Sequence, residues 1–307
     1  MSYKTVFYAL GTENSIILED ADISDVLKMI VERVLNIEEK MSAFKDSSEI
    51  SKIASNSGIC GTRVSEDVFC VLEKALDVSQ ASKGAFDVTV RPLTKLWNFG
   101  NEMDSIPEKA DIEAAKSCVG YQNLVLEPKE RTAFFTNSGC KIDLGGIAKG
   151  YAANEAKRIL LEHGVKSALI NFGGNIMAVG QSFENAPWKI GIQNPLSERG
   201  APVLTIDITD KAVVTSAVNE RFFIRDGIRY HHIFNPISGY PAQSGLLSVT
   251  IIDECSMLAD ALSTAVFVLG ATEGLKLIRK YKSEVILITE SGDILSSFEI
   301  NHPTNIA

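Results

Sequence analysis

Two side chains with oxygen ligands lie four residues apart in the otherwise apolar segment SMLADALSTAVFVLG (256–270). Four residues span about one turn of an α-helix, so Asp260 and Thr264 would lie on the same helix face. A buried carboxylate and a buried hydroxyl cost free energy unless each has a partner. They could hydrogen-bond each other, or they could bind a hard cation such as Mg²⁺, which prefers oxygen ligands and substrate phosphates. The spacing leaves both alternatives open.

Paired glycines mark two further candidate sites. KIDLGGIAKGYAAN (141–154) has the pattern of a strand, a turn with Gly145 and Gly146, and a helix with Lys149 in its first turns. Free backbone amides and the positive end of the helix dipole would favour an anion there, although a tight turn packed closely through glycine explains the pattern equally well. In ALINFGGNIMAVG (168–180), the glycines favour a hairpin turn, or a close approach of a flat ligand to the backbone.

Two adjacent histidines stand in RYHHIFNPISGYP (229–241), between a predicted strand and a turn rich in proline and glycine. Side chains alternate across a strand, so His231 and His232 would point to opposite faces and at most one would face a site. A single histidine is more often structural than functional. The neighbouring loop favours function here, because loops at strand ends frequently carry sites.

Aromatic residues accompany polar ones in two more segments. GAFDVTVRPL (84–93) has strand-like alternation that would place Phe86 on the face opposite Asp87. MSAFKDSSEISKI (41–53) places Phe44 before a serine-rich stretch that is equally typical of a helix cap. Core packing and turn formation are alternatives to function for both segments.

The elements that would position these residues are predicted from hydrophobic spacing. Helices are expected over 22–41, 65–82, 108–118, 147–163 and 256–270. Strands are expected over 5–18 (two, around Gly11), 123–136, 166–179, 188–194, 202–214, 221–225, 229–234, 245–252 and 284–298. Strands outnumber helices and follow one another in runs, which indicates an α+β fold with mixed or antiparallel sheets and packed helices.

The chain contains no long linker or internal repeat. The polar stretches 98–112 and 181–187 are the best boundaries, yet both are too short for a free linker. We therefore expect a single domain over 1–307, compact or bilobal, with its site between the lobes.

Composition excludes several classes of partner. The chain has 307 residues, of which 30 are lysine or arginine and 39 are aspartate or glutamate, so a formal charge of −9 would repel nucleic acid. No run approaches the ~18 apolar residues of a membrane span, and the first residues lack the pattern of a signal peptide. The sequence as written indicates a cytoplasmic protein. A removed leader would instead be compatible with an extracytoplasmic lipoprotein.

In their order along the chain, these segments resemble the ApbE family of FAD:protein FMN transferases. The resemblance covers about 41–270 and rests on MSAFKDSSEIS, GAFDVTVRPLTKLW, CVGYQNL, KIDLGGIAKGYAAN, ALINFGGNIMAVG, WKIGIQNP, VVTSAVNERF, HHIFNPISGYP and MLADALSTAVFVLG. It implies an ApbE-type α+β fold with FAD between lobes. The implied activity is Mg²⁺-dependent transfer of FMN from FAD to a Ser/Thr hydroxyl in the flavinylation motif of an acceptor redox flavoprotein, with release of AMP.

The resemblance also assigns roles to residues. Asp260, Thr264 and the main-chain carbonyl of Gly146 are the implied magnesium ligands, and His232 corresponds to the family's essential histidine. The implied FAD contacts are Leu10, Phe44, Ala85, Phe86, Asp87, Asp143, Lys149 and Ile233. Lys149 and the metal would stabilise the negative charge that develops when a pyrophosphate is cleaved, and His232 would take the proton of the acceptor hydroxyl.

The sequence departs from the family pattern at several points. Phe44 stands where a tyrosine is frequent, Asn235 replaces an aspartate, Ala217 replaces a glycine, and the chain has no lipobox. Phenylalanine keeps the ring for stacking but lacks the phenol hydroxyl. Two alternatives to transfer therefore remain: an Mg²⁺-dependent FAD pyrophosphatase that gives FMN and AMP, and a protein that binds FAD without turning it over.

Overall fold

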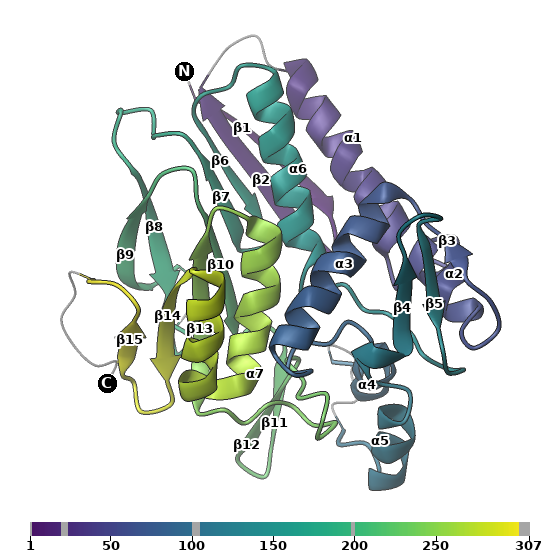
Figure 1. Ribbon diagram of the computed structural model, residues 1–307. Helices are drawn as coiled ribbons and strands as arrows, with labels where there is room; N and C mark the ends of the chain where they lie inside the picture. Colours follow the sequence, from purple (N-terminus) through teal and green to yellow (C-terminus); the bar gives the residue numbers. More distant parts are fainter. Residues whose placement is uncertain (1, 20–23, 100–104, 198–199, 301–307) are drawn as a thin grey trace.

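A large antiparallel sheet forms the centre of the molecule in the computed structural model, which describes residues 2–19, 24–99, 105–197 and 200–300 (Figure 1). Its eight strands lie in the order β1-β2-β6-β7-β10-β13-β14-β15. They are β1 (Ser2–Ala9), β2 (Thr12–Glu19), β6 (Ala168–Phe172), β7 (Asn175–Val179), β10 (Ala212–Ala217), β13 (Leu246–Asp253), β14 (Glu284–Thr289) and β15 (Ile294–Ser296). Every neighbouring pair is antiparallel, as the runs of consecutive strand patterns predict.

Helices cover one face of this sheet (Figure 1). They are α1 (Ser24–Met41), α6 (Ala148–Glu162) and α7 (Ser256–Tyr281), and α3 (Glu66–Ala81) packs against α7 and α1. In α1 the apolar residues recur at helical spacing and are buried, which fixes the face that the helix turns to the core. On the opposite face, the hairpin of β8 (Trp188–Gln193) and β9 (Pro202–Ile208) buries its own apolar residues against those of the sheet.

Smaller elements lie beside the main sheet. A three-stranded sheet contains β3 (Thr62–Arg63), β5 (Thr132–Phe135) and β4 (Leu124–Glu127), with α2 (Glu49–Ser55) and the 3-10 turn η1 (Tyr121–Asn123) next to it in sequence. The hairpin of β11 (Phe222–Arg225) and β12 (Ile228–His231) packs its aromatic residues near α4 (Arg91–Trp97) and α5 (Lys109–Lys116). In Figure 1 this hairpin projects below α7.

Helix α7 is longer than the sequence pattern predicts. The expected helix over 256–270 continues to Tyr281 after a kink at Gly270, whose φ of 75° suits glycine. Among the described residues, α7 is the one helix long and apolar enough by length and composition to cross a membrane. Its most apolar window is 56% buried in the protein, which is typical of a core helix.

Several local predictions are wrong. Residues 84–93 do not form a strand: they form turns that lead into α4, so Phe86 and Asp87 do not occupy opposite faces of a strand, and both are buried. Residues 141–144 make only an isolated bridge, Val90 with Lys141, before α6 begins. The two short helices α2 and α4 were not predicted: each has seven residues, and hydrophobic periodicity over so short a length is too brief to detect.

Candidate active site

The centre of the candidate site is the point where α6 crosses α7. Gly150 makes this crossing possible, because a Cβ atom there would lie 2.4 Å from the carbonyl oxygen of Ser256 and 2.6 Å from Cα of Met257. Only glycine permits backbones to approach so closely. As a result, the backbone N–H of Gly150 donates a 2.9 Å hydrogen bond to Oδ2 of Asp260.

Asp260 is a buried carboxylate with few charged neighbours. It is 4% exposed, and burial raises its pKa, while the charge of Lys149 and the Gly150 hydrogen bond act in the opposite direction. The Nζ atom of Lys149 lies 4.0 Å from Oδ1 of Asp260 and donates a 3.1 Å hydrogen bond to the carbonyl oxygen of Gly145. A cation beside Oδ1 would therefore relieve a carboxylate that the protein neutralises incompletely.

Thr264, one turn along α7, faces the glycine turn that precedes α6. A Cβ atom on Gly146 would lie 3.2 Å from Oγ1 of Thr264 and 3.3 Å from Cε2 of Phe86. Oγ1 of Thr264 also lies 3.4 Å from Oγ of Ser216. Asp260 and Thr264 thus have separate partners in other elements, which favours the cation alternative over a mutual hydrogen bond.

The donor chemistry of this cluster suits a hard divalent cation. The described residues contain no group of three or more histidine, cysteine, aspartate or glutamate side chains placed to hold a metal. The oxygens that converge here come from one carboxylate, one hydroxyl and backbone carbonyls, a set that Mg²⁺ accepts when substrate phosphates and waters complete its shell. The residues present fit such an ion, and the metal assignment stays a prediction.

Asp143 connects the glycine turn to two residues that sequence reasoning missed. Its Oδ1 accepts a 3.0 Å hydrogen bond from the Gly145 amide, and its Oδ2 accepts one of 2.8 Å from Thr94 Oγ1. Nη1 of Arg91 lies 3.6 Å from the same Oδ2. The guanidinium carbon of Arg91 also lies 4.2 Å from the ring centroid of Phe44, so Arg91 joins two of the predicted FAD contacts.

Phe44 presents its ring to solvent. The side chain lies in the turn after α1 and is 80% exposed, and Arg91 is its described ring contact. An exposed aromatic ring held by one guanidinium is suited to stacking on a flat ligand. Arg91 is the first residue of α4, directly before Pro92, and its local sequence carries no signal for these contacts.

Asp87 is occupied by its own loop. Oδ1 accepts hydrogen bonds from the amide and hydroxyl of Thr89, at 2.8 and 2.7 Å, and Oδ2 accepts one of 2.7 Å from the Tyr121 amide. Burial raises its pKa. These bonds give Asp87 a structural role beside Ala85 and Phe86, which are both buried, and direct contact of Asp87 with FAD stays a prediction.

The two histidines have different surroundings, because β12 ends at His231 and His232 lies in the loop that follows. His231 is buried, its Nε2 lies 2.9 Å from the carbonyl oxygen of Ala242, and its ring packs edge-on against Phe267. His232 is partly exposed, with Nδ1 at 3.3 Å from the carbonyl oxygen of Arg221. Burial, helped by nearby positive charge that includes Lys149, lowers the pKa of His232 to about 4. A neutral imidazole beside Lys149 can accept a proton at neutral pH.

The remaining predicted FAD contacts are Ile233 and Leu10, and no described contact joins either of them to Asp260 or Lys149. Ile233 follows His232 and is buried in the main core. Leu10 forms the β1–β2 turn with Gly11 and adopts a φ of 55°. That turn lies beside the β6–β7 turn, because a Cβ atom on Gly173 would approach Cγ2 of Thr12 to 2.5 Å. Two hairpin turns therefore meet at one end of the sheet.

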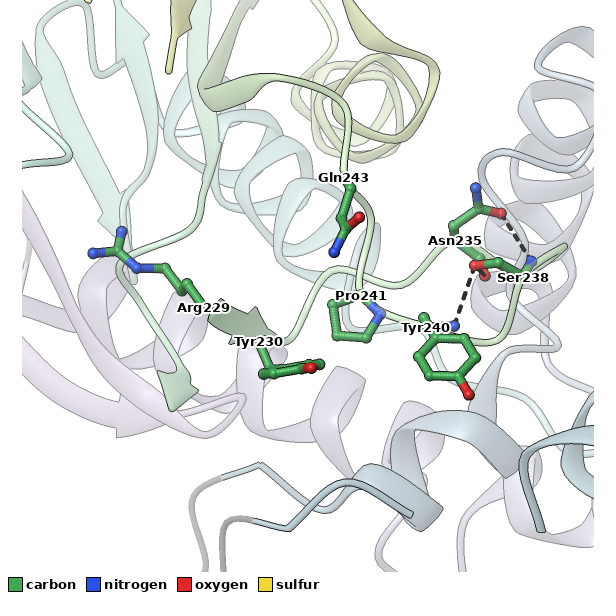
Figure 2. A pocket seen from close by; sticks show the side chains of 7 residues that line it. All are labelled: Arg229, Tyr230, Asn235, Ser238, Tyr240, Pro241 and Gln243. Atoms are coloured by element: carbon green, nitrogen blue, oxygen red, sulfur yellow. Dashed lines mark hydrogen bonds between the residues drawn. The ribbon is translucent and has the colours of Figure 1, made fainter. Parts of the chain in front are cut away.

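A cavity of about 410 Å³ is lined by residues that precede and follow the two histidines in the sequence (Figure 2). None of the predicted FAD contacts lines this cavity. Its lining residues come from both sides of the pair: Arg229, Tyr230, Asn235, Ser238, Tyr240, Pro241 and Gln243.

The fold and the site together define an α+β protein that places a buried carboxylate and a lysine at a glycine turn, as suits a phosphate-bearing ligand, with a histidine whose pKa the charge of that lysine helps to lower. The sequence profile of the ApbE family matches residues 10–288. The chain belongs to the ApbE family.

Relatives and solved structures agree with this assignment. The chain is 33% identical over 269 residues to an FAD:protein FMN transferase of Klebsiella pneumoniae, covering 87% of this chain and 83% of that protein. A protein of the same name from Treponema pallidum is 32% identical over 274 residues, covering 85% and 76%.

Two solved structures share the fold. An ApbE protein from Thermotoga maritima matches with a TM-score of 0.88 and 34% identity over 97% of both chains. The flavin transferase ApbE from Vibrio cholerae matches with a TM-score of 0.88 and 26% identity, again over 97% of both. The predicted ApbE-type α+β fold is confirmed.

Proposed function

We infer that this chain is an FAD:protein FMN transferase, an enzyme that moves FMN from FAD to an acceptor flavoprotein. Family membership and the names of relatives that cover most of the chain support this activity. The observation that carries the assignment to this site is the α6–α7 crossing, where Asp260, Lys149 and the Gly145–Gly146 turn converge.

We further propose that the acceptor group is a serine or threonine hydroxyl. Its oxygen would attack the phosphorus of the FMN half of FAD, and the bond from that phosphorus to the bridging oxygen would break. AMP leaves with the bonding electrons, and FMN remains attached to the acceptor through a phosphoester. His232 takes the hydroxyl proton: its lowered pKa of about 4 keeps the imidazole neutral and able to accept at neutral pH, although it also makes this ring a weaker base than an ordinary histidine.

The proposed cofactor is Mg²⁺, held by Asp260, Thr264 and the carbonyl oxygen of Gly146. When bound, it would neutralise the pyrophosphate and the charge that develops on its oxygens. Lys149 contributes a fixed positive charge on the same side, 4.0 Å from Asp260. The turn of Gly145 and Gly146 leaves no side chain between the phosphates and the backbone.

A second candidate function is hydrolysis of FAD to FMN and AMP, with water in place of the acceptor hydroxyl. Phe44 supports this alternative, because its ring is 80% exposed and has no phenol to hydrogen-bond the flavin. The same cation and histidine would serve both reactions.

The test is incubation of the purified chain with FAD and Mg²⁺, with and without an acceptor domain that carries a flavinylation threonine. Mass spectrometry should find the acceptor heavier by one FMN residue and AMP in solution. Free FMN and AMP with an unlabelled acceptor would favour the pyrophosphatase, and intact FAD in both tubes would leave a binding protein.

The His232→Ala variant tests the proposed base. It should bind FAD as the wild type does and lose about 100-fold or more in transfer, within the range for a general base. Normal transfer by this variant would refute the assignment of His232.

A further inference from the structure

Exposed apolar side chains are frequent in the segment that contains His232. Five of the sixteen large hydrophobic residues that are exposed among the described residues lie within the nineteen positions 222–240. They are Phe222 (39% exposed), Ile224 (62%), Ile228 (46%), Ile237 (70%) and Tyr240 (36%). Scattered exposed apolar residues need no explanation, whereas a group beside a functional residue indicates an interaction surface.

The β11–β12 hairpin presents part of this group on one face. Cross-strand pairing places Phe222 opposite His231 and Ile224 opposite Arg229, so these four side chains share a face. The face is buried at His231 and exposed towards the turn, where the Arg229 guanidinium lies 4.6 Å from the Phe222 ring centroid. The other face packs Phe223 and Tyr230 into the aromatic cluster around α4.

The loop after His232 is held rigidly. Oδ1 of Asn235 accepts the amides of Ile237 and Ser238 at 2.9 and 3.3 Å, which shows why asparagine can replace the family's aspartate here. Nε1 of Trp97 donates a 3.0 Å hydrogen bond to the carbonyl oxygen of Gly239, which fastens the loop to α4. A surface that is already ordered loses little conformational entropy when a partner binds.

The cavity of Figure 2 lies between this loop and β12. After the loop, the chain returns to the residues that follow β12. The amide of Ala242 donates a 2.9 Å hydrogen bond to the carbonyl oxygen of Ile233. Tyr230 and Tyr240 supply aromatic walls, and Arg229 supplies a positive charge. Arg229, Tyr230 and Asn235 in the lining lie within three positions of His232 along the chain, so a peptide segment bound in the cavity would lie near this histidine.

We propose that the exposed face of the β11–β12 hairpin and this cavity form the docking surface for the acceptor protein. The occupant is an extended acceptor segment that carries the receiving hydroxyl, with apolar side chains against Phe222 and Ile224 and an acidic side chain on Arg229. Charge complementarity supports this partner, because 221–229 contains three arginines and one aspartate in a chain of net charge −9. The proposal rests on the proposed FMN transfer.

The test uses an acceptor domain that the wild-type chain labels, together with its threonine-to-alanine variant, which binds but cannot be flavinylated. Ile224→Glu and Arg229→Glu should each weaken binding of the unlabelled acceptor variant by about tenfold or more, as expected for central interface residues. The KM for the reactive acceptor should rise in parallel. The FAD affinity and any acceptor-free hydrolysis should stay within about twofold of wild type, because neither residue belongs to the proposed FAD site.

The matched control is Ile59→Glu, the same substitution at a residue that is 77% exposed outside the hairpin and loop. It should leave acceptor binding unchanged. Unchanged binding in both hairpin variants, or an equal loss in the control, would overturn the docking surface. Light scattering would compare the oligomeric state of the wild type and of Ile224→Glu. If the wild type is a dimer, the variant is a monomer and acceptor binding is unchanged, this face is a dimer interface and the proposal is wrong. A wild-type chain that labels no acceptor would overturn the proposed function, and this proposal with it.

Discussion

A partly buried carboxylate, Asp67, and a buried one, Asp260, accept hydrogen bonds from adjacent residues of α6, yet their surroundings differ. Asp67 is bonded by Tyr151 at 2.7 Å and by Lys40 at 2.6 Å, and it also forms an ion pair with Arg33. Hydrogen bonds from Arg33 chiefly hold its pKa far below the ordinary value. Asp260 accepts one amide from Gly150 and has Lys149 only at 4.0 Å, so burial raises its pKa.

The difference separates a structural charge from a functional one. Asp67 is fully compensated within the protein and ties together α1, α3 and α6. Asp260 is the more deeply buried of the two and lacks equivalent partners, which costs folding free energy unless an external cation completes the site. Gly150 and Tyr151, which are neighbours in α6, therefore donate hydrogen bonds to two carboxylates with different roles.

The largest expected effect comes from removing the charge of Asp260. Asp260→Asn keeps an acceptor for the Gly150 amide but should lower FMN transfer by at least about 100-fold, because the proposed Mg²⁺ site would lose its one carboxylate. A raised pKa means that the ionised form destabilises the fold as pH rises above the ordinary aspartate range. Without metal, the variant should thus be as stable as wild type, or more stable, at neutral pH. Full activity of Asp260→Asn, or a clear loss of its stability in thermal unfolding, would contradict the different roles assigned to Asp260 and Asp67.

Asp67→Ala should give the opposite result. Removing one partner leaves Arg33 and Lys40 partly buried without their shared carboxylate, which should cost about 3 kcal/mol in the free energy of unfolding measured with urea. The folded fraction should transfer FMN normally. Asp25→Ala is the control, because the Asp25–Lys28 pair at 3.0 Å is highly exposed and should contribute less than about 1 kcal/mol. Loss of activity in fully folded Asp67→Ala protein would contradict a purely structural role.

The contrast between these carboxylates also shows what the sequence can and cannot predict. Asp260 and Thr264 are recognisable because two polar residues interrupt an apolar helix at one-turn spacing. The α+β class and most strands follow from periodicity for the same reason. Asp67 has no such signal: it lies in the first turn of α3, where acidic residues are common. Its partners come from α1 and α6, and only the tertiary structure brings them together.

Local alternation was misleading where hydrogen-bonded turns override it. In 84–93 the polar residues alternate because Asp87 binds the amides of Thr89 and Tyr121, so the pattern reflects a loop network and not a strand. Arg91 was missed for a related reason. Its contacts with Phe44 and Asp143 join segments about fifty residues apart on either side, which no local pattern records.

The pH profile of transfer should distinguish His232 from an ordinary histidine. Burial, His231, Arg221 and Lys149 lower its pKa to about 4, so the ring stays neutral and able to accept a proton well below neutral pH. Between about pH 7 and about pH 5.5, the rate constant at saturating substrate should change less than about twofold, whereas a base with a pKa of about 6.5 would lose about tenfold. The fold itself should lose stability over the same range, because the unfolded histidines take up protons that the folded ones refuse. A tenfold fall in rate would place His232 in a more solvated setting than this structure gives it.

The smallest expected effect concerns Arg91. It has fewer charged partners than Asp67, but its charged neighbour is closer than the one beside Asp260. Its guanidinium is 3.6 Å from Asp143 and 4.2 Å from the exposed Phe44 ring, so it is paired but still open towards the predicted flavin. Arg91→Ala should raise the KM for FAD by about two- to fivefold, the magnitude of a cation–π contact near solvent, with little change in kcat. Arg91→Lys keeps the charge but loses the planar group that covers the ring, so it should recover only part of the affinity. If the alanine variant lowers kcat and leaves the KM for FAD unchanged, Arg91 acts on the reacting phosphates, and Phe44 is held by other contacts.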